Sequence, residues 1–352
     1  MFTPRPTSPR LAPLGPQDAD DTQRAMLAAS PDYNIYKTLA HDLDFARAFG
    51  ALGRFTLNGS GLPPREREIV MLRMGWLCQS EYEWAQHARI AKSDAGLSDA
   101  DLHRIAQGPD VAGWRDTERA LLRMVDELRC DAMVSDATWR ALRARYANPQ
   151  MLALILTAGQ YQFVSMALNS LGVQLDPGLQ DRLPRDLVLP AVAERPASPR
   201  LKSPRIEVAT VNHPKLFSAY AQFVRYVRHE SRLPSKARAL LIMRTAWNVR
   251  DEIGWARHAE AAQAAGFTEA ELARVAAGPS ASGWSDQHAV LLQAADELHR
   301  EAFISNGTWQ TLRALFDQKQ MIALIATVGG TAMAGLMTNS LGHLVDAERQ
   351  QH

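Results

Sequence analysis

The sequence predicts an all-α protein in which two tandem copies of one helical domain form a pseudo-dimer. The first observation is a repeat. A segment that begins at Leu62 aligns with one that begins at Leu233, and the shift of 171 positions becomes 170 after a single-residue gap. The second is that apolar residues recur at helical spacing in both copies, while the alternation of β-branched residues typical of strands is scarce. A period this long indicates a duplicated domain and not an array of short repeats.

The copies share residues that seldom coincide by chance. Tryptophan is rare, yet four tryptophans of the first copy align with tryptophans of the second. The shared positions include Trp76/Trp247, Trp84/Trp255, Trp114/Trp284, Trp139/Trp309, Arg73/Arg244, Glu81/Glu252, His87/His258, Gly108/Gly278 and Asn169/Asn339. Comparing the copies therefore shows which polar positions both kept and which only one kept.

Four segments follow one another along the chain. Residues 1–31 are rich in Pro, Ser and Asp and predict a disordered lead-in. Residues 32–176 form the first predicted domain, and residues 207–346 form the second, degenerate one. Between them, residues 177–206 contain several prolines and predict an extended linker. Ser, Thr and Asp signals mark helix starts inside each domain, and we expect about six helices in each.

Composition narrows the class of protein. The chain has 352 residues, and Lys+Arg 39 against Asp+Glu 38 gives a formal net charge of +1, so nothing favours nucleic acid or an anionic membrane as a partner. No apolar run follows Arg5 or Arg10, so no secretory signal is visible. The two cysteines, Cys78 and Cys130, have no cysteine partners in the second copy. A disulfide framework is not expected, and a reducing cytoplasm is the predicted location.

Two long segments, 151–175 and 321–345, carry no Asp, Glu, Lys or Arg and are long enough to resemble membrane-spanning helices. Polar residues such as Gln160 and Asn169 interrupt them, and glycines occur in both. A helix that is apolar on nearly all sides also arises at the centre of a bundle or between subunits. We therefore expect buried core helices and no membrane association.

The densest chemical cluster runs from Cys78 to His87. Glu83 and His87 are four residues apart, so on a helix they face the same way. A carboxylate and an imidazole at this spacing can share a proton or divide the acid and base roles near neutral pH. Glu68 lies nineteen residues before His87 and can enter the same pocket if two helices pack antiparallel. These three residues are the predicted catalytic group.

Structural alternatives stand beside this interpretation. Ser80 and Glu83 match a capping box, in which Glu83 would reach back to the Ser80 amide. In the second copy Asp251 would keep the cap, while Gly254 drops the box partner. Trp84 is expected to be a core or interface residue more than a stacking platform. A divalent ion could be bound chemically by Glu68, Glu83 and His87. No other feature of the sequence indicates a metal ion, so no metal or cofactor is predicted.

Several motifs together resemble a known superfamily. They are Leu62-Pro-Pro-Arg-Glu-Arg-Glu68, Glu81-Tyr-Glu-Trp-Ala-Gln-His87, Gly159-Gln-Tyr161 and Asn169-Ser-Leu-Gly172. The chain is similar in these to the carboxymuconolactone decarboxylase/alkylhydroperoxidase D-like superfamily, over roughly residues 35–176 and more weakly 207–346. The resemblance implies small all-helical domains that assemble into trimers or hexamers, with active sites near the helix that carries the histidine.

The resemblance also separates two kinds of activity. In the alkylhydroperoxidase branch two cysteines spaced CxxC precede the histidine, and their positions fall here at Ser80 and Glu83. A dithiol peroxidase needs an attacking thiolate and a resolving thiol, which neither position supplies. We therefore predict a cofactor-free lyase that uses His/Glu acid–base chemistry on a small carboxylated or lactone/carbonyl substrate. An alkylhydroperoxidase-like antioxidant protein and a non-catalytic ligand-binding or assembly protein are the alternatives.

Roles in this lyase follow from the chemistry. His87 would protonate carbon or stabilise an enolate, while Glu68 or Glu83 sets its protonation state. Arg73 is a candidate for the substrate carboxylate, with a surface or salt-bridge role as the alternative. The predicted substrate-binding residues are Tyr82, Arg73, Tyr161, Trp84 and Cys78.

The second copy departs from this pattern. Glu68 becomes Ala239, Glu83 becomes Gly254 and Tyr161 becomes Thr331, although the histidine survives. An altered site could still form from His258, Glu252 and Asp251. We expect instead one well-equipped site per chain, in the first half, with the second half imitating a neighbouring subunit. The expected assembly is a homo-oligomer, a dimer or trimer of the tandem chain.

Overall fold

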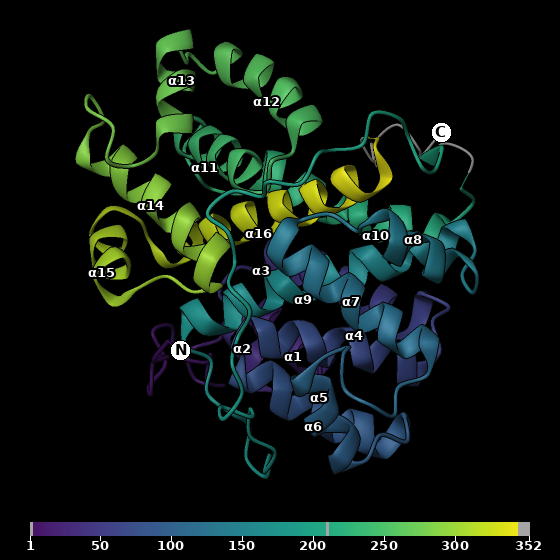
Figure 1. Cartoon of the computed structure of the whole chain (residues 1–352). Coiled ribbons are helices and arrows are strands. Elements are labelled where there is room, and N and C mark those ends of the chain that lie inside the picture. Colours follow the sequence, from purple (N-terminus) through teal and green to yellow (C-terminus); the bar gives the residue numbers. More distant parts are fainter. Residues whose placement is uncertain (1–2, 209–210, 344–352) are drawn as a thin grey trace.

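The computed structural model describes residues 3–208 and 211–343 (Figure 1). Helices dominate this part of the chain, and it contains no strand, which confirms the all-α prediction. Residues 1–2 of the predicted lead-in and residues 209–210 and 344–346 of the second predicted domain lie outside the described residues.

Each copy of the repeat consists of six consecutive helices. Those of the first are α4 (Pro64–Leu77), α5 (Glu81–Asp94), α6 (Asp99–Gln107), α7 (Asp116–Asp131), α8 (Asp136–Arg143) and α9 (Asn148–Leu171). Those of the second are α11 (Ser235–Asn248), α12 (Glu252–Ala264), α13 (Glu269–Ala277), α14 (Asp286–Glu301), α15 (Asn306–Leu315) and α16 (Gln318–Leu341). The predicted tandem pseudo-dimer is confirmed.

Further helical elements precede each set of six. The first domain has α2 (Asn34–Leu39) and α3 (Leu43–Arg54), and a π-helical turn at Phe55–Gly59 follows α3. The second has α10 (Pro214–Arg225), followed by a π-helical turn at Tyr226–Glu230. The helix starts are capped as the sequence indicates: for example, Ser98 accepts from the Asp101 amide and Thr268 from the Glu271 amide.

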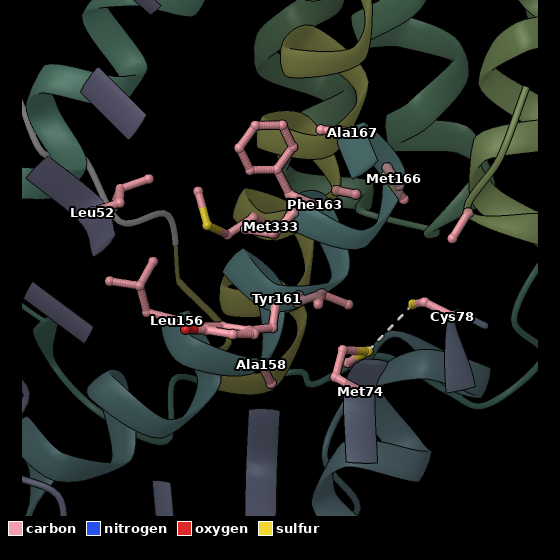
Figure 2. Packing of buried hydrophobic residues seen from close by; sticks show 14 of the residues in the cluster. Leu52, Met74, Cys78, Leu156, Ala158, Tyr161, Phe163, Met166, Ala167 and Met333 are labelled. Carbon is pink, nitrogen blue, oxygen red and sulfur yellow. Dashed lines mark hydrogen bonds between the residues drawn. The ribbon is translucent and has the colours of Figure 1, made fainter. Parts of the chain in front are cut away.

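Helices α9 and α16 form the centre of the molecule and pack against each other across the domain boundary (Figure 1). Two glycines permit the close approach. A Cβ on Gly159 would lie 2.9 Å from the Met333 Cγ, and one on Gly329 would overlap the Phe163 ring. Figure 2 shows Phe163 and Met333 in this apolar core. By length and composition both helices could cross a membrane, but 100% and 94% of their most apolar windows are buried, as in core helices.

The repeated Asn-Ser-Leu-Gly motif at the ends of α9 and α16 joins the two domains. The Asn169 side-chain amide donates to the carbonyls of Cys78 in its own domain (2.9 Å) and Ala302 in the other (3.1 Å). Asn339 makes the symmetric pair of bonds, to Val249 and Ala132. The next residue in each motif, Ser170 or Ser340, accepts from a backbone amide of the opposite domain. Both copies therefore need this motif for pairing.

The described part of the lead-in, residues 3–31, packs onto the protein, whereas its composition predicted disorder. It contains α1 (Asp21–Ala28), capped by Asp20, and it buries Leu11 and Leu14. The composition of the lead-in suggested disorder because it is rich in Pro, Ser and Asp. Composition does not reveal partners that are far away in the sequence, such as the Leu171 carbonyl that accepts from the Arg10 amide.

The linker has no α-helix over residues 177–206, and it contacts both domains. The Trp76 indole donates to the Pro184 carbonyl at 2.9 Å. The linker also ends in a second version of a short motif. Residues 4–11, which we call the N-terminal strap, and residues 199–206, the linker strap, share the pattern Pro-Arg-x-x-Ser-Pro-Arg followed by Leu or Ile.

Candidate functional site

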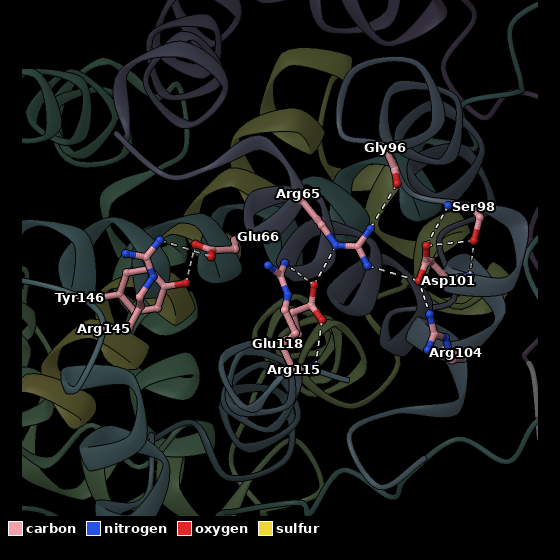
Figure 3. A network of polar contacts seen from close by, with 10 residues as sticks. All are labelled: Arg65, Glu66, Gly96, Ser98, Asp101, Arg104, Arg115, Glu118, Arg145 and Tyr146. Carbon is pink, nitrogen blue, oxygen red and sulfur yellow. Dashed lines mark hydrogen bonds and ion pairs between the residues drawn. The ribbon is translucent and has the colours of Figure 1, made fainter. Parts of the chain in front are cut away.

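The start of α4 is anchored by a network of charged side chains, shown in Figure 3. Pro64 occupies the first turn of α4, where a missing amide proton costs nothing. Arg65 donates to Glu118 at 2.7 Å and to Asp101 at 3.3 Å, and so ties α4 to α7 and α6. Tyr146 donates to Glu66 at 2.6 Å. These contacts hold the helix that carries Glu68.

Helices α4 and α5 pack closely because α4 carries a glycine at the crossing. A Cβ on Gly75 would lie 3.3 Å from the Glu83 Cγ. The glycine therefore leaves room for the Glu83 side chain between the helices.

The three predicted catalytic residues meet. The His87 Nδ1 lies 2.7 Å from Glu68 Oε2, and the His87 Nε2 lies 3.0 Å from Glu83 Oε1. Tyr161 of α9 places its hydroxyl 3.1 Å from the same Nε2, with its ring edge-on to the imidazole at a centroid distance of 4.9 Å. All four side chains are buried. The site therefore draws on α4, α5 and α9.

Electrostatics fix the protonation of this group. Burial alone would lower the pKa of His87, but Glu68 and Glu83 outweigh it and raise the pKa to about 10. Burial opposes ionisation of Glu68, yet His87 and Arg67 lower the pKa of that carboxyl overall. Burial, reinforced by Glu83 and Glu68, raises the pKa of Tyr161 well above its ordinary value. At neutral pH the site holds an imidazolium, an ionised Glu68 and a neutral phenol.

Arg67 belongs to this group, although the sequence interpretation passed over it. Its guanidinium donates to Glu68 Oε1 through Nε at 3.2 Å and Nη2 at 3.1 Å. A third bond, 2.6 Å to the Leu57 carbonyl, holds it against the π-helical turn. The retention of this position as Arg238 in the second copy was the available signal.

The capping box that stood as an alternative role for Ser80 and Glu83 in the first copy does not form. Ser80 precedes α5, but its side chain makes no cap hydrogen bond, and Glu83 turns to His87 instead. A carboxylate gains more from a buried imidazolium than from a neutral amide. In the second copy Asp251 accepts from the Gly254 amide at 2.8 Å, which confirms the predicted cap.

Three of the predicted substrate-binding residues lie elsewhere than beside His87. The Tyr82 hydroxyl donates to Asp176, which also accepts from Gln86. Trp84 is a core residue, 2% exposed. Cys78 is fully buried with its sulfur 3.8 Å from that of Met74, a contact drawn in Figure 2, and burial raises the pKa of its thiol. Of the residues predicted to bind substrate, only Tyr161 contacts the imidazole.

Arg73 is engaged in a structural ion pair. Its guanidinium donates twice to Asp126, at 2.6 and 3.1 Å, and twice to the backbone carbonyls of Ile105 and Ala106. Arg244 pairs in the same way with Asp296. The structure thus favours the salt-bridge alternative over a role in binding the substrate carboxylate.

The second-copy candidates are not brought together. Glu252 is exposed and pairs with Arg250 at 3.0 Å, while Asp251 caps α12. No carboxylate of residues 3–208 or 211–343 lies within ion-pair distance of His258. Burial, together with Arg228 and Arg257, lowers the pKa of this histidine to about 4.

A cavity of about 600 Å³ lies beside the first site. Tyr36, Arg54 and Leu57 line it, along with Met26 and Pro31 from the lead-in. The Leu57 carbonyl accepts a hydrogen bond from Arg67. Burial raises the pKa of Tyr36, and the negative charge of the nearby Glu83 raises it further. The cavity therefore lies close to the His87 group, although none of the side chains of Glu68, Glu83, His87 and Tyr161 lines it.

No group of three His, Cys, Asp or Glu side chains suited to a metal ion occurs within the described ranges. At His87 both ring nitrogens already contact protein groups. The expectation that no metal or cofactor is required stays a prediction.

Comparison with known proteins gives a consistent result. The model of the carboxymuconolactone decarboxylase family matches residues 44–127 and again residues 214–297. A crystal structure of a protein of unknown function from Agrobacterium tumefaciens, proposed to be an antioxidant defence protein AhpD, is 20% identical. The match covers 43% of this chain and 95% of that one, at a TM-score of 0.36. Among curated proteins, none matches.

The two family matches coincide with the two halves of the helical repeat. Each match begins in or at the helix that precedes the π-helical turn and ends in the fourth helix of its six-helix set, α7 or α14. The chain therefore contains two domains of the carboxymuconolactone decarboxylase family in tandem.

Proposed function

We propose that the first domain is a cofactor-independent acid–base catalyst, a lyase acting on a small carboxylated lactone or carbonyl compound. One observation carries the proposal: His87 is held at both ring nitrogens by carboxylates, with Tyr161 at the Nε2 end. Groups with strongly perturbed pKa values that converge on one buried point are typical of catalytic sites.

The two ends of the imidazole have different tasks in this proposal. Glu68, itself held by Arg67, orients the ring through Nδ1. The Nε2 end, shared by Glu83 and Tyr161, faces the reacting group. A pKa of about 10 keeps His87 protonated at neutral pH, so it acts as a proton donor and not as the base.

The proposed reaction is a decarboxylation. The bond to the substrate carboxylate breaks, carbon dioxide leaves, and the electron pair moves into the conjugated carbonyl to give an enolate. The enolate then takes the proton of His87 at carbon, and solvent returns a proton to the imidazole. The neutral Tyr161 hydroxyl can donate to the enolate oxygen. The 600 Å³ cavity would admit the substrate, and Arg54 in its lining would take the place of Arg73 as partner for the carboxylate.

Turnover of a γ-lactone acid tests this function. His87→Gln should lower kcat by ~10²–10⁴-fold, and Glu83→Gln should also lower it, because general acid–base catalysis contributes on this scale. His103→Gln is the matched control, since His103 is an exposed histidine of α6 in the same domain. Unchanged turnover in both site variants would contradict the proposal.

The antioxidant alternative makes a separate prediction. It requires a reactive thiolate, but burial raises the pKa of both Cys78 and Cys130. We expect no thiol-dependent peroxide consumption by the purified chain. Peroxide consumption that disappears in Cys78→Ser would support the antioxidant function instead.

A further inference from the structure

Tyr36 of α2 connects the cavity of about 600 Å³ to the His87 group. It lines the cavity, whereas none of the side chains of that group does. Burial raises the pKa of Tyr36, and Glu83 is close enough for its negative charge to raise it further. Tyr36 in turn adds to the larger effects of burial and the two carboxylates that raise the pKa of Tyr161. A molecule in the cavity that contacts Tyr36 is therefore next to the His87 group.

The position of Tyr36 is fixed by contacts between its helix and α5. The Ile35 amide donates to the Tyr82 hydroxyl of α5 at 3.4 Å. Arg89, also on α5, donates to the Tyr33 hydroxyl at 2.7 Å. The ring of Tyr33 stacks on that of Tyr36 with their centroids 6.2 Å apart. These contacts place the Tyr36 ring without using its hydroxyl.

The Tyr36 hydroxyl has no hydrogen-bond partner within residues 3–208 and 211–343. By contrast, the hydroxyls of Tyr82, Tyr146 and Tyr161 each contact a buried side chain. Because burial raises its pKa, the Tyr36 phenol is neutral at pH 7 and can donate. The wall of the cavity therefore carries a hydrogen-bond donor that has no protein acceptor.

A cation lies beside this hydroxyl. Arg54 also lines the cavity, and its positive charge opposes the rise in the pKa of Tyr36. The Arg54 guanidinium makes no ion pair with a carboxylate of the described ranges, whereas the other lining arginine, Arg47, pairs with Asp44 at 3.1 Å. No Asp or Glu is found in the described lining. The apolar part of the lining includes Met26, Leu39, Phe49 and Leu57.

The second half lacks both parts of this arrangement. Residues 177–208 and 211–213 contain no α-helix, so no described element in front of α10 corresponds to α2. Arg54 aligns with Arg225, and each directly precedes a π-helical turn. The Arg225 guanidinium is paired with Glu230 at 2.9 Å, where the first copy has Gly59. The tyrosine and the unpaired arginine thus occur in the copy that keeps the carboxylates around His87.

We propose that Tyr36 is a substrate-binding residue, which holds the substrate carboxylate together with Arg54 at the side of the cavity next to the His87 group. The class of substrate in this inference rests on the proposed function. Arg54 balances the charge of the carboxylate, and the Tyr36 hydroxyl donates to one of its oxygens. The carbon that bears the carboxylate then lies toward Glu83 and His87. Tyr36 positions the substrate, and His87 remains the proton donor.

Calorimetric titration of the full chain with γ-carboxy-γ-butyrolactone tests the binding step alone, because this saturated lactone acid has no conjugated carbonyl and does not decarboxylate. Tyr36→Phe and Arg54→Gln should each weaken its binding by about tenfold or more, since a hydrogen bond to a charged group contributes on this scale. Tyr33→Phe is the matched control, because Tyr33 is an equally half-buried tyrosine outside the cavity lining and should bind as the parent does. The neutral γ-butyrolactone should bind the parent at least about tenfold more weakly than the acid.

Kinetics with a γ-lactone acid that turns over give a second measurement. Tyr36→Phe should raise KM by about tenfold and leave kcat within about twofold, because loss of a contact made equally to the bound substrate and the transition state raises KM alone. Thermal denaturation without ligand verifies that each variant is folded. If Tyr36→Phe did not fold, Arg54→Gln would still test the site, because Arg54 is exposed.

The outcomes separate this inference from the proposed function. No binding of γ-carboxy-γ-butyrolactone to the parent, equal affinity in Tyr36→Phe or in Arg54→Gln, or equal affinity for γ-butyrolactone would overturn the inference. If turnover depends on His87 while Tyr36→Phe behaves as Tyr33→Phe does, the lyase function stands and the inference is wrong. If the acid binds as expected but no γ-lactone acid is turned over, the carboxylate site stands and the lyase function is wrong.

Discussion

His87 and His258 occupy equivalent positions and have opposite acid–base properties. Carboxylates on both sides raise the pKa of the first to about 10, while burial and two arginines lower the pKa of the second to about 4. At pH 7 one is an imidazolium and the other a neutral imidazole. The residue type is conserved between the copies, but its chemistry is set by neighbours that are not.

Glu68→Gln tests this dependence. The variant removes the carboxylate at Nδ1 while keeping a hydrogen-bond acceptor, so the pKa of His87 should fall by about one to three pH units. NMR titration of the imidazole resonances measures the change. The resonance of His258 in the same spectrum is the internal control, and a pKa of His87 that does not move would contradict the assignment of Glu68 as its main partner.

The raised pKa of His87 also predicts how stability depends on pH. The folded state holds the proton more tightly than the unfolded state, whose histidine has a pKa of about 6.5. The stabilising contribution is complete below about pH 6.5 and is lost as the pH rises toward about 10. Urea denaturation should show that the free energy of unfolding of the parent chain falls across this pH range. The fall should be smaller in His87→Gln. Parallel curves for the two proteins would be evidence against the buried imidazolium.

At the scale of elements, the contact between α9 and α16 depends on glycines that face side chains of the partner helix. Gly329→Ala should destabilise the chain by about 1–3 kcal/mol, because its Cβ would overlap the Phe163 ring in a closely packed core. Gly307→Ala on α15 is the control, since a Cβ there meets nothing within 4 Å. Chemical denaturation of the two variants compares them, and equal stabilities would show that the core relaxes freely.

Local sequence patterns were sufficient to predict the helices, and an alignment of the two halves was sufficient to predict the repeat. The meeting of Glu68, Glu83 and His87 was also predictable, because Glu83 and His87 are one helical turn apart and Glu68 lies on the adjacent helix. The capping box failed because the same serine and glutamate spacing serves a cap or a buried ion pair. Only the position of the imidazole in three dimensions decides between them.

Features that depend on distant partners could not be predicted from the sequence. The lead-in has the composition of a disordered segment, yet its apolar side chains are buried against a domain that begins later in the chain. Arg73 has the right type for a substrate carboxylate, but Asp126, on α7, is its partner. In both examples the deciding contact joins residues that lie on different elements and are more than fifty positions apart in the sequence.

At the scale of the whole molecule, the two straps connect the domains symmetrically. Arg10 donates to the Ile304 carbonyl of the second domain (2.7 Å) and to the Ser170 carbonyl of the first (3.1 Å). Arg205 of the linker strap donates to Val134 of the first domain (2.7 Å) and to Ser340 of the second (3.2 Å). Each guanidinium therefore bridges the boundary between the domains.

Arg10→Ala and Arg205→Ala should each lower the free energy of unfolding by about 1.5–3 kcal/mol, since each removes charged hydrogen bonds to carbonyls of both domains. Arg140→Ala is the control, because Arg140 is exposed and bonds only within its own helix. In calorimetry, the unfolding transition of the strap variants should begin to divide into two transitions, one for each domain. A single unshifted transition in both would mean that the straps do not couple the domains.

The assembly of chains stays a prediction that rests on the superfamily resemblance. Light scattering on the purified protein should give two or three times the chain mass of 38.9 kDa. A mass of one chain would show that the fused pair of domains replaces the oligomer.

The straps also reveal where the two halves differ in length. They are offset by 195 positions, whereas the repeats that follow them are offset by 171, so the first half carries 24 additional residues between strap and repeat. This is the region that holds α1 and α2, and it supplies Met26, Pro31 and Tyr36 to the cavity beside His87. The extra segment therefore covers the cavity near His87, and the second half has no segment of this length at the corresponding place.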